Sequence, residues 1–173
     1  MQRSTITNEP SQLTSAQISD RLGKALARLF DRDADLLKRD VNERSITHRL
    51  AIYVEEQFPE WFVDCEFNKH GDGVKEIKNP DIAELSGATV SAADTDAISV
   101  FLDIIVHGRT RDANFLAIEV KKTTRAKSVK DFDQKKLEAY RDELGYAFTA
   151  FLVLPTGKHY GDKPYIEVHN HAA

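Results

Sequence analysis

Two acidic residues and a lysine stand out because they interrupt strongly apolar segments. Asp103 lies within the apolar run over residues 98–107, and Glu119 and Lys121 lie within the run over residues 115–121. Burying an ionised carboxylate without a partner is costly, so each acid needs a cation, a hydrogen-bond network or contact with solvent. Carboxylate oxygens are hard ligands, which favour Mg²⁺ or Mn²⁺ over zinc. The pattern therefore predicts a divalent-cation site beside an ammonium group.

The two apolar segments are expected to pair as an antiparallel hairpin, because Gly108 and Asp112 between them favour a turn. If the hairpin is symmetric about Arg111, Asp103 lies directly opposite Glu119, with Cβ atoms about 4.5–5.5 Å apart. Like charges at that distance repel, and a divalent cation between them would remove the repulsion. A register slip of one residue would instead place the two acids on opposite faces of the sheet.

Strand geometry groups the second acid with the lysine. Successive side chains of a strand alternate between its two faces, so Glu119 and Lys121 should point the same way, together with Phe115 and Ala117. The Lys121 ammonium would then lie beside the carboxylates, where it can orient or activate a water molecule.

A third acid is expected to reach the same sheet from a helix. Glu43 precedes Ile46, Leu50 and Val54 at helical spacing, which puts it on the core-facing stripe. An acid in the first helical turn is also favoured by the helix dipole alone, so a purely structural role for Glu43 stays open.

These residues require a mixed α/β domain in which helices flank a central sheet. Helices are expected from Thr14 or Ser15 through residue 29, from Asn42 to about Phe58, and over residues 128–144 before Gly145. Strands are expected over residues 61–67, 98–107, 115–121, 147–154 and 165–169. We expect residues 1–13 to be a polar lead-in to a single domain over residues 14–173, in which residues 69–95 are mostly loop.

The composition bounds the class of protein. The chain has 173 residues, 41% of them hydrophobic, which is enough for one domain with a substantial core. A net charge of -4 excludes a uniformly basic nucleic-acid coat, so any phosphate-binding surface must be a local patch. Cys65 is the only cysteine, which excludes an intrachain disulfide and favours a reducing compartment. Because no signal region or long apolar stretch stands out, we expect a soluble cytoplasmic protein without a membrane partner.

The order of these groups resembles the PD-(D/E)XK nuclease superfamily, and in particular a group of small bacterial members. Asp103 is followed on the next strand by Glu119-Val120-Lys121, and Glu43 lies on a preceding helix. The likeness covers roughly residues 41–154 and is carried by residues 43–45, 48–51, 63–66, 103–107, 118–122, 136–137, 140 and 144–146. Leu102 departs from the pattern, because the superfamily has a proline before its metal-binding aspartate.

The resemblance implies a restriction-endonuclease-like three-layer sandwich and Mg²⁺- or Mn²⁺-dependent hydrolysis of phosphodiesters, with DNA favoured over RNA. It implies that Asp103 and Glu119 bind the metal together with the backbone carbonyl of Val120. Lys121 would position the attacking water, and Glu43 would support the metal directly or through water. A lysine of the following helix, Lys135 or Lys136, would complete the pattern.

A basic stretch leaves the predicted site and is expected to hold substrate phosphates. The predicted nucleic-acid-binding residues are Lys122, Arg125, Lys127, Lys130 and Lys136. An ordinary solvated surface would have the same composition.

One rival motif is rejected, and two alternatives stay open. A second Glu-x-Lys, Glu76-Ile77-Lys78 near Pro80-Asp81, lies in a polar region and is rejected as the site for lack of a flanking apolar strand. The chain could keep a nuclease fold as a non-catalytic module that binds nucleic acid or a partner protein. A homodimer is possible, because the apolar stripe of residues 18–29 suits an interface as well as a core.

Overall fold

The computed structural model describes residues 13–65, 69–70, 73–74, 76–77, 98–99, 102–109, 113–123 and 126–171. The helices are α1 (Ser15–Arg32), α2 (Ala34–Lys38), α3 (Glu43–Gln57), α5 (Ala126–Leu144) and the short 3₁₀ helix η2 (Gly157–His159). The main sheet has five strands, in the spatial order β1 (Phe62–Cys65), β6 (Ile104–His107), β7 (Asn114–Lys122), β8 (Phe148–Leu154) and β9 (Tyr165–Asn170). Four two-residue strands pair separately: β2 (Lys69–His70) with β3 (Gly73–Val74), and β4 (Glu76–Ile77) with β5 (Ile98–Ser99).

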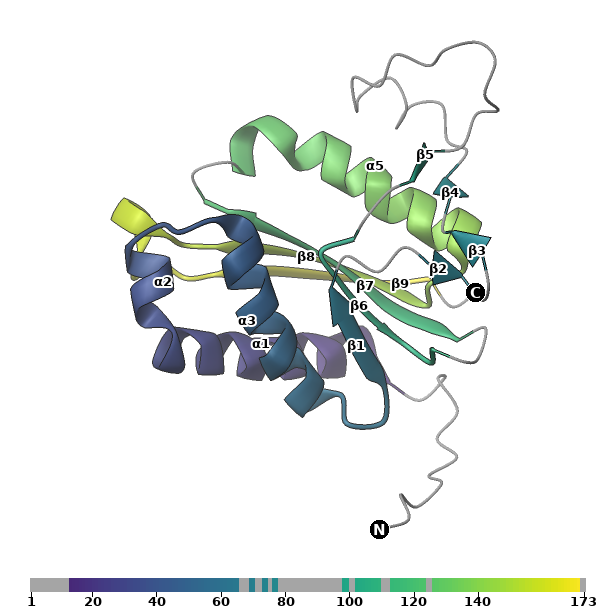
Figure 1. Ribbon diagram of the computed structural model, residues 1–173, viewed down its shortest axis with the longest axis horizontal. Coiled ribbons are helices and arrows are strands. Elements are labelled where there is room, and N and C mark those ends of the chain that lie inside the picture. Colours follow the sequence, from purple (N-terminus) through teal and green to yellow (C-terminus); the bar gives the residue numbers. More distant parts are fainter. Residues whose placement is uncertain are drawn as a thin grey trace.

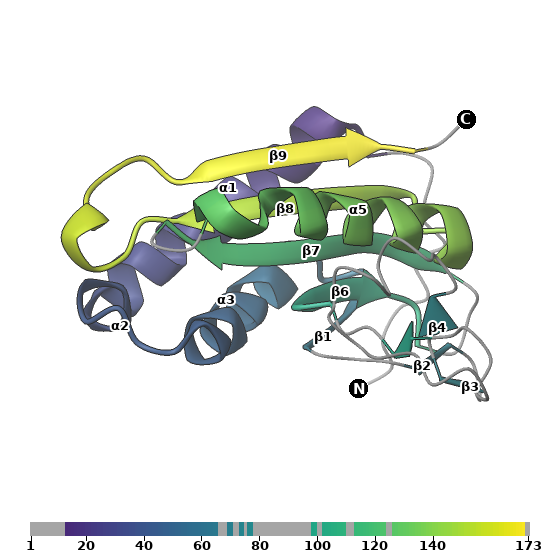
Figure 2. The same ribbon diagram turned by 90° about the horizontal axis from the view of Figure 1, so that it is seen from above.

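The sheet is mixed and carries helices on both faces. β7 and β8 run parallel, whereas the other neighbours in the sheet pair antiparallel. Helices α1 and α3 cover one face and α5 covers the other (Figure 1, Figure 2). Each face has its own buried apolar cluster, and the cluster beneath α5 is the smaller. The predicted α/β class with a central mixed sheet and flanking helices is therefore confirmed.

Helix α1 begins where the sequence predicts. Thr14 and Gln17 form a capping box, in which Gln17 N donates to Thr14 Oγ1 at 3.2 Å and Thr14 N donates to Gln17 Oε1 at 2.8 Å. The apolar stripe of this helix, Ile18, Leu22, Leu26 and Leu29, is at most 2% exposed. The stripe is thus part of the core, and its alternative interpretation as a dimer interface is wrong.

Helix α3 starts and helix α5 stops at the predicted residues, whereas α5 begins at Ala126, two residues before its predicted start. Asn42 Oδ1 accepts a hydrogen bond from Arg44 N at 2.9 Å, so α3 starts at Glu43. Helix α5 stops at Leu144, after which Gly145 takes a positive φ of 65° that suits a residue without a Cβ. In the described part of the chain, no helix is both long and apolar enough to cross a membrane.

The long strand predicted over residues 98–107 is interrupted. β5 ends at Ser99, β6 begins at Ile104, and Asp103 lies just outside the ladder. The main-chain N–H of Val120 donates to the Asp103 carboxylate. At this point of the β6–β7 pair, a side-chain oxygen therefore replaces the main-chain carbonyl that would accept in a continuous strand. Asp103 therefore marks the end of the strand rather than its interior.

Phe115 also differs from its predicted placement beside Ala117. A register shift between Val106 and His107 disturbs the pairing at this end of β7. Phe115 packs on the opposite side of the sheet, where its ring stacks on Trp61 with centroids 4.6 Å apart.

Candidate active site

Away from its turn, the β6–β7 hairpin has the predicted register, whereas His107 is shifted by one residue and pairs with Asn114. Ile104 pairs with Ile118 and Ile105 with Ala117. Continuing this register by one residue places Asp103 opposite Glu119. The hydrogen bond from Val120 N to Asp103 Oδ2, 2.8 Å long, fixes the first carboxylate at this end of the hairpin.

The carboxylate of Glu119 is completely buried. Its side chain is 0% exposed, and the Lys136 ammonium of α5 lies directly against Oε1. The Lys121 ammonium lies 3.7 Å from Oε2. The ion pairs offset the charge, yet neither oxygen accepts a hydrogen bond of acceptable geometry. A buried acceptor left in this state is unfavourable and calls for a ligand.

The buried charge of Glu119 perturbs the ionisation of Asp103. Burial, and next the negative charge of Glu119, raise the pKa of Asp103 to about 7. The Val120 N–H and the ammonium groups of Lys136 and Lys121 oppose this rise without cancelling it. The Asp103 carboxyl therefore holds a proton in slightly acidic solution, which a cation would displace.

Glu43 reaches the site from the start of α3. Its Oε1 lies 3.5 Å from the Lys121 ammonium, and its Oε2 accepts a hydrogen bond from Lys122 N at 3.2 Å. The prediction that the first turn of this helix faces the sheet is confirmed by these contacts. Two acids and a lysine from the hairpin and one acid from α3 thus gather at one end of β7.

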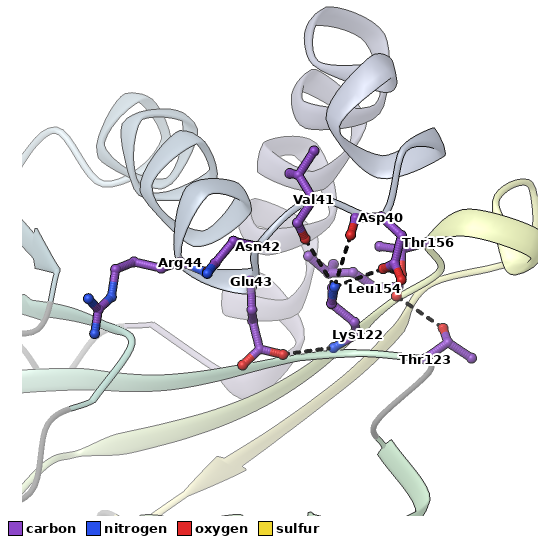
Figure 3. A network of polar contacts seen from close by, with 9 residues as sticks. All are labelled: Asp40, Val41, Asn42, Glu43, Arg44, Lys122, Thr123, Leu154 and Thr156. Atoms are coloured by element: carbon purple, nitrogen blue, oxygen red, sulfur yellow. Dashed lines mark hydrogen bonds and ion pairs between the residues drawn. The ribbon is translucent and has the colours of Figure 1, made fainter.

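Lys122 points to the other face of β7, into a polar network (Figure 3). The side chain is 9% exposed, and its ammonium lies 2.8 Å from Asp40 Oδ1 and 3.0 Å from the carbonyl oxygen of Val41. Thr156 Oγ1 donates to the same Asp40 oxygen at 2.7 Å. The Lys122 ammonium therefore joins the segment before α3 to β7 and is not exposed to nucleic acid, contrary to the sequence prediction.

The other predicted phosphate-binding residues have different outcomes. Lys136 is 8% exposed and faces the buried carboxylate rather than solvent, again contrary to prediction, whereas its neighbour Lys135 is exposed. Arg125 lies outside the described residues. Lys127 and Lys130 fall within α5, but their side chains lie outside the described part.

A cleft of about 1020 Å³ leads to the site. Glu43 and Asp103 both line it, and the exposed side chains of Arg44 and His48 from α3 contribute to its wall. Arg49 lines it too, with its Nε 3.1 Å from Asp33 Oδ1. The cleft is large enough for a substrate-sized group and combines acids with basic side chains.

The donor atoms fit a hard divalent cation. Within the described ranges, no set of three or more His, Cys, Asp or Glu side chains is placed to hold a metal ion. Mg²⁺, however, commonly uses only one or two carboxylates and keeps several waters. The unsatisfied buried oxygens of Glu119, next to Asp103 with its raised pKa, supply such a pair.

Glu76 and Ile77 of the rejected motif form β4, and Lys78, Pro80 and Asp81 lie outside the described residues.

A further cluster has no counterpart in the sequence predictions. The Asp64 carboxylate accepts from Arg109 Nε at 2.8 Å and lies 2.8 Å from Nε2 of the buried His107. The hydrogen bonds from Arg109 above all, and that from His107, hold the pKa of Asp64 below its usual range although burial opposes them. Asp64 lies near His107 because the β1–β6 register pairs it with Ile105, two residues before His107. The cluster fastens the edge strand β1.

Comparison of the chain with protein-family models, with curated proteins and with solved structures gave no match.

Proposed function

We propose that this protein is a Mg²⁺- or Mn²⁺-dependent nuclease of the PD-(D/E)XK type that hydrolyses phosphodiester bonds. The observation that carries the proposal is the buried Glu119 carboxylate, whose oxygens lack hydrogen bonds and which faces Asp103 across a hairpin. Asp103 and Glu119 would hold the cation, together with the main-chain carbonyl of Val120 and water.

The residues around the carboxylates suit attack on a phosphodiester. A divalent cation, when bound, would neutralise charge on the phosphoryl oxygens and favour deprotonation of water. Lys121 lies within 3.7 Å of Glu119 and 3.5 Å of Glu43, so its ammonium is held where it can orient the attacking water. The water oxygen forms the new bond to phosphorus, the bond to the leaving oxygen breaks, and a proton passes to that oxygen.

The fold and the cleft support a nucleic-acid substrate. Helices on both faces of a mixed sheet, with the acids on a central hairpin, are compatible with a restriction-endonuclease-like sandwich. The cleft beside Asp103 carries Arg44 and His48, whose side chains suit phosphate contacts. We favour DNA as the substrate and the cytoplasm as the location.

Cleavage of supercoiled plasmid and of single-stranded DNA tests the proposal. The wild type should cleave with Mg²⁺ or Mn²⁺ and stop when EDTA is added. Asp103→Asn and Lys121→Met should each lower the single-turnover rate at least about 100-fold. Lys158→Met removes the same charge at an exposed position and should cleave like the wild type. Equal rates in all four proteins would reject Asp103 and Lys121 as catalytic residues.

A non-catalytic module that binds nucleic acid or a partner protein is the second candidate. The contact between the Lys136 ammonium and Glu119 favours it, because a lysine can compensate the buried charge without any metal. The same preparations distinguish the two functions. Retention of DNA in a filter-binding assay, with no cleavage and no calorimetric signal for Mn²⁺, would favour the module.

A further inference from the structure

Lys136 is an unusual residue for the interior of this protein. Its side chain is 10% exposed, whereas lysines are almost never buried unless they are paired. It lies on α5 next to Leu137 and one turn before Tyr140, two buried apolar residues of the cluster beneath this helix. Its partner is Glu119, whose carboxylate is 0% exposed. Helix α5 therefore places one positive charge, the Lys136 ammonium, against Oε1 of Glu119 in an otherwise apolar layer.

Lys136 is the nearer of the two counter-ions of Glu119. The Lys121 ammonium lies farther away, at 3.7 Å, and also lies 3.5 Å from Glu43. The Lys136 ammonium touches Oε1 and, after the Val120 N–H, is the next influence that lowers the pKa of Asp103. One ammonium group thus compensates both acids of the candidate metal pair.

A cation cannot bind Oε1 of Glu119 while this ammonium keeps its position. The carboxylate has no exposed surface, and Lys136 covers Oε1. Two positive groups on one carboxylate oxygen in a poorly hydrated site repel each other strongly. A divalent cation must therefore displace the ammonium to reach the oxygen.

We propose that Lys136 is a built-in placeholder for the metal, an inference that rests on the metal site of the proposed function. In the metal-free protein its ammonium stabilises the two neighbouring acids. On metal binding, the Lys136 ammonium would have to move away from Oε1 of Glu119, which its flexible side chain allows. The exchange weakens metal binding by the free energy needed to separate the ion pair, so metal and lysine compete for one site.

Calorimetric titration with Mn²⁺ at pH 8.5, above the pKa of Asp103, tests the competition. Lys136→Gln keeps a hydrogen-bond donor but loses the charge, and should bind Mn²⁺ at least about tenfold more tightly than the wild type. Lys135→Gln removes the same charge from the adjacent exposed position and should stay within about twofold of the wild type. Lys136→Arg keeps the charge and should not bind more tightly than the wild type.

Thermal unfolding supplies a second readout that does not depend on activity. Without metal, Lys136→Gln should unfold at a lower temperature than Lys135→Gln, because two acids lose their counter-ion. Saturating Mn²⁺ should raise the Tm of Lys136→Gln by more than it raises the Tm of the wild type. Should Lys136→Gln be too unstable to titrate without metal, recovery of a cooperative transition in Mn²⁺ supports the exchange, and failure to recover overturns it.

The outcomes separate this inference from the proposed function. If the wild type binds Mn²⁺ and Lys136→Gln binds it equally or more weakly, the placeholder is overturned and the metal site stands. If Lys135→Gln gains as much affinity as Lys136→Gln, the effect is one of general charge and the placeholder is again overturned. If neither the wild type nor any variant binds Mn²⁺, both proposals fail.

Discussion

The N–H of Val120 donates to Oδ2 of Asp103 at 2.8 Å. An ionisable carboxylate thus makes the last hydrogen bond at this end of the β6–β7 pair. The same carboxylate opens onto the cleft and faces a second, buried acid. Ionisation and strand pairing are therefore linked at one residue, to which the proposed function adds cation binding.

The first consequence is an unusual dependence of stability on pH. The pKa of Asp103 is raised by burial and by Glu119 from 3.8 to about 7, so the folded chain holds this proton more tightly than the unfolded chain. Its contribution to the free energy of unfolding is fully present below pH 4, falls as the pH rises through 4–7, and is lost above 7. Asp103→Asn keeps an acceptor for Val120 N, and at pH 8 should be more stable than the wild type by up to about 4 kcal/mol. Urea unfolding of both proteins at pH 5 and pH 8 measures the difference.

Asp64 provides a control of opposite sign. Hydrogen bonds from Arg109 and His107 lower its pKa, so its contribution is present above pH 4 and is lost as the pH falls through the folded pKa. Asp64→Asn should therefore be less stable than the wild type at pH 8, by roughly 1–3 kcal/mol. A gain in stability for both variants at pH 8 would contradict the assignment of Asp103.

Cation binding should release a proton. Because the cation favours the ionised form of Asp103, Mn²⁺ should displace up to about one proton per ion at pH 6 and much less at pH 8. The apparent affinity should weaken up to about tenfold for each pH unit below 7. Calorimetric titrations in two buffers of different ionisation enthalpy give the number of protons. A proton release independent of pH would show that Asp103 is not displaced by the metal.

Local signals explain the parts of the fold that the sequence predicts. Thr14 and Asn42 cap helices through neighbouring main-chain atoms, and Gly145 ends a helix through its own φ, so each can be located from a few residues. The apolar residues of the two strands indicate the hairpin, and symmetry about Arg111 gives the observed pairs Ile104–Ile118 and Ile105–Ala117. The shift at His107 next to the turn was not predicted, because no local signal marks it.

The fates of the lysines could not be predicted in this way. A run of basic residues predicts side chains exposed to solvent. Only the tertiary structure reveals that Lys122 contacts Asp40, a residue 82 positions earlier in the chain. Lys136 likewise lies beside Glu119 because α5 packs on the sheet. The apolar residues 98–107 predict one strand, yet β6 begins only at Ile104, because the side chain of Asp103 accepts the hydrogen bond of Val120 N just before it.

The Lys122 network should act on stability rather than on nucleic-acid affinity. Lys122→Met removes the cation that lies 2.8 Å from the Asp40 carboxylate and 3.0 Å from the carbonyl oxygen of Val41. The free energy of unfolding should fall by about 1–3 kcal/mol, because Asp40 keeps only part of its partners. Lys163→Met, at an exposed position, should change it by less than about 0.5 kcal/mol. Weakened DNA binding with unchanged stability would restore Lys122 to the phosphate-binding surface.

Glu43 should act through Lys121 rather than as a metal ligand. Glu43→Gln keeps an acceptor for Lys122 N but removes the charge that lies 3.5 Å from the Lys121 ammonium. The single-turnover cleavage rate should fall about tenfold or more, while the Kd for Mn²⁺ changes less than about threefold. Paired cleavage and titration experiments on one preparation check this. A tenfold loss of Mn²⁺ affinity would instead make Glu43 a ligand.

Anomalous diffraction from crystals of the wild type soaked in Mn²⁺ tests the shared cation site most directly. The account predicts a single strong peak about 2.0–2.3 Å from a carboxylate oxygen of Asp103 and from one of Glu119, with the Lys136 ammonium moved away. A peak elsewhere, or no peak while Lys136 still contacts Glu119, would contradict the account.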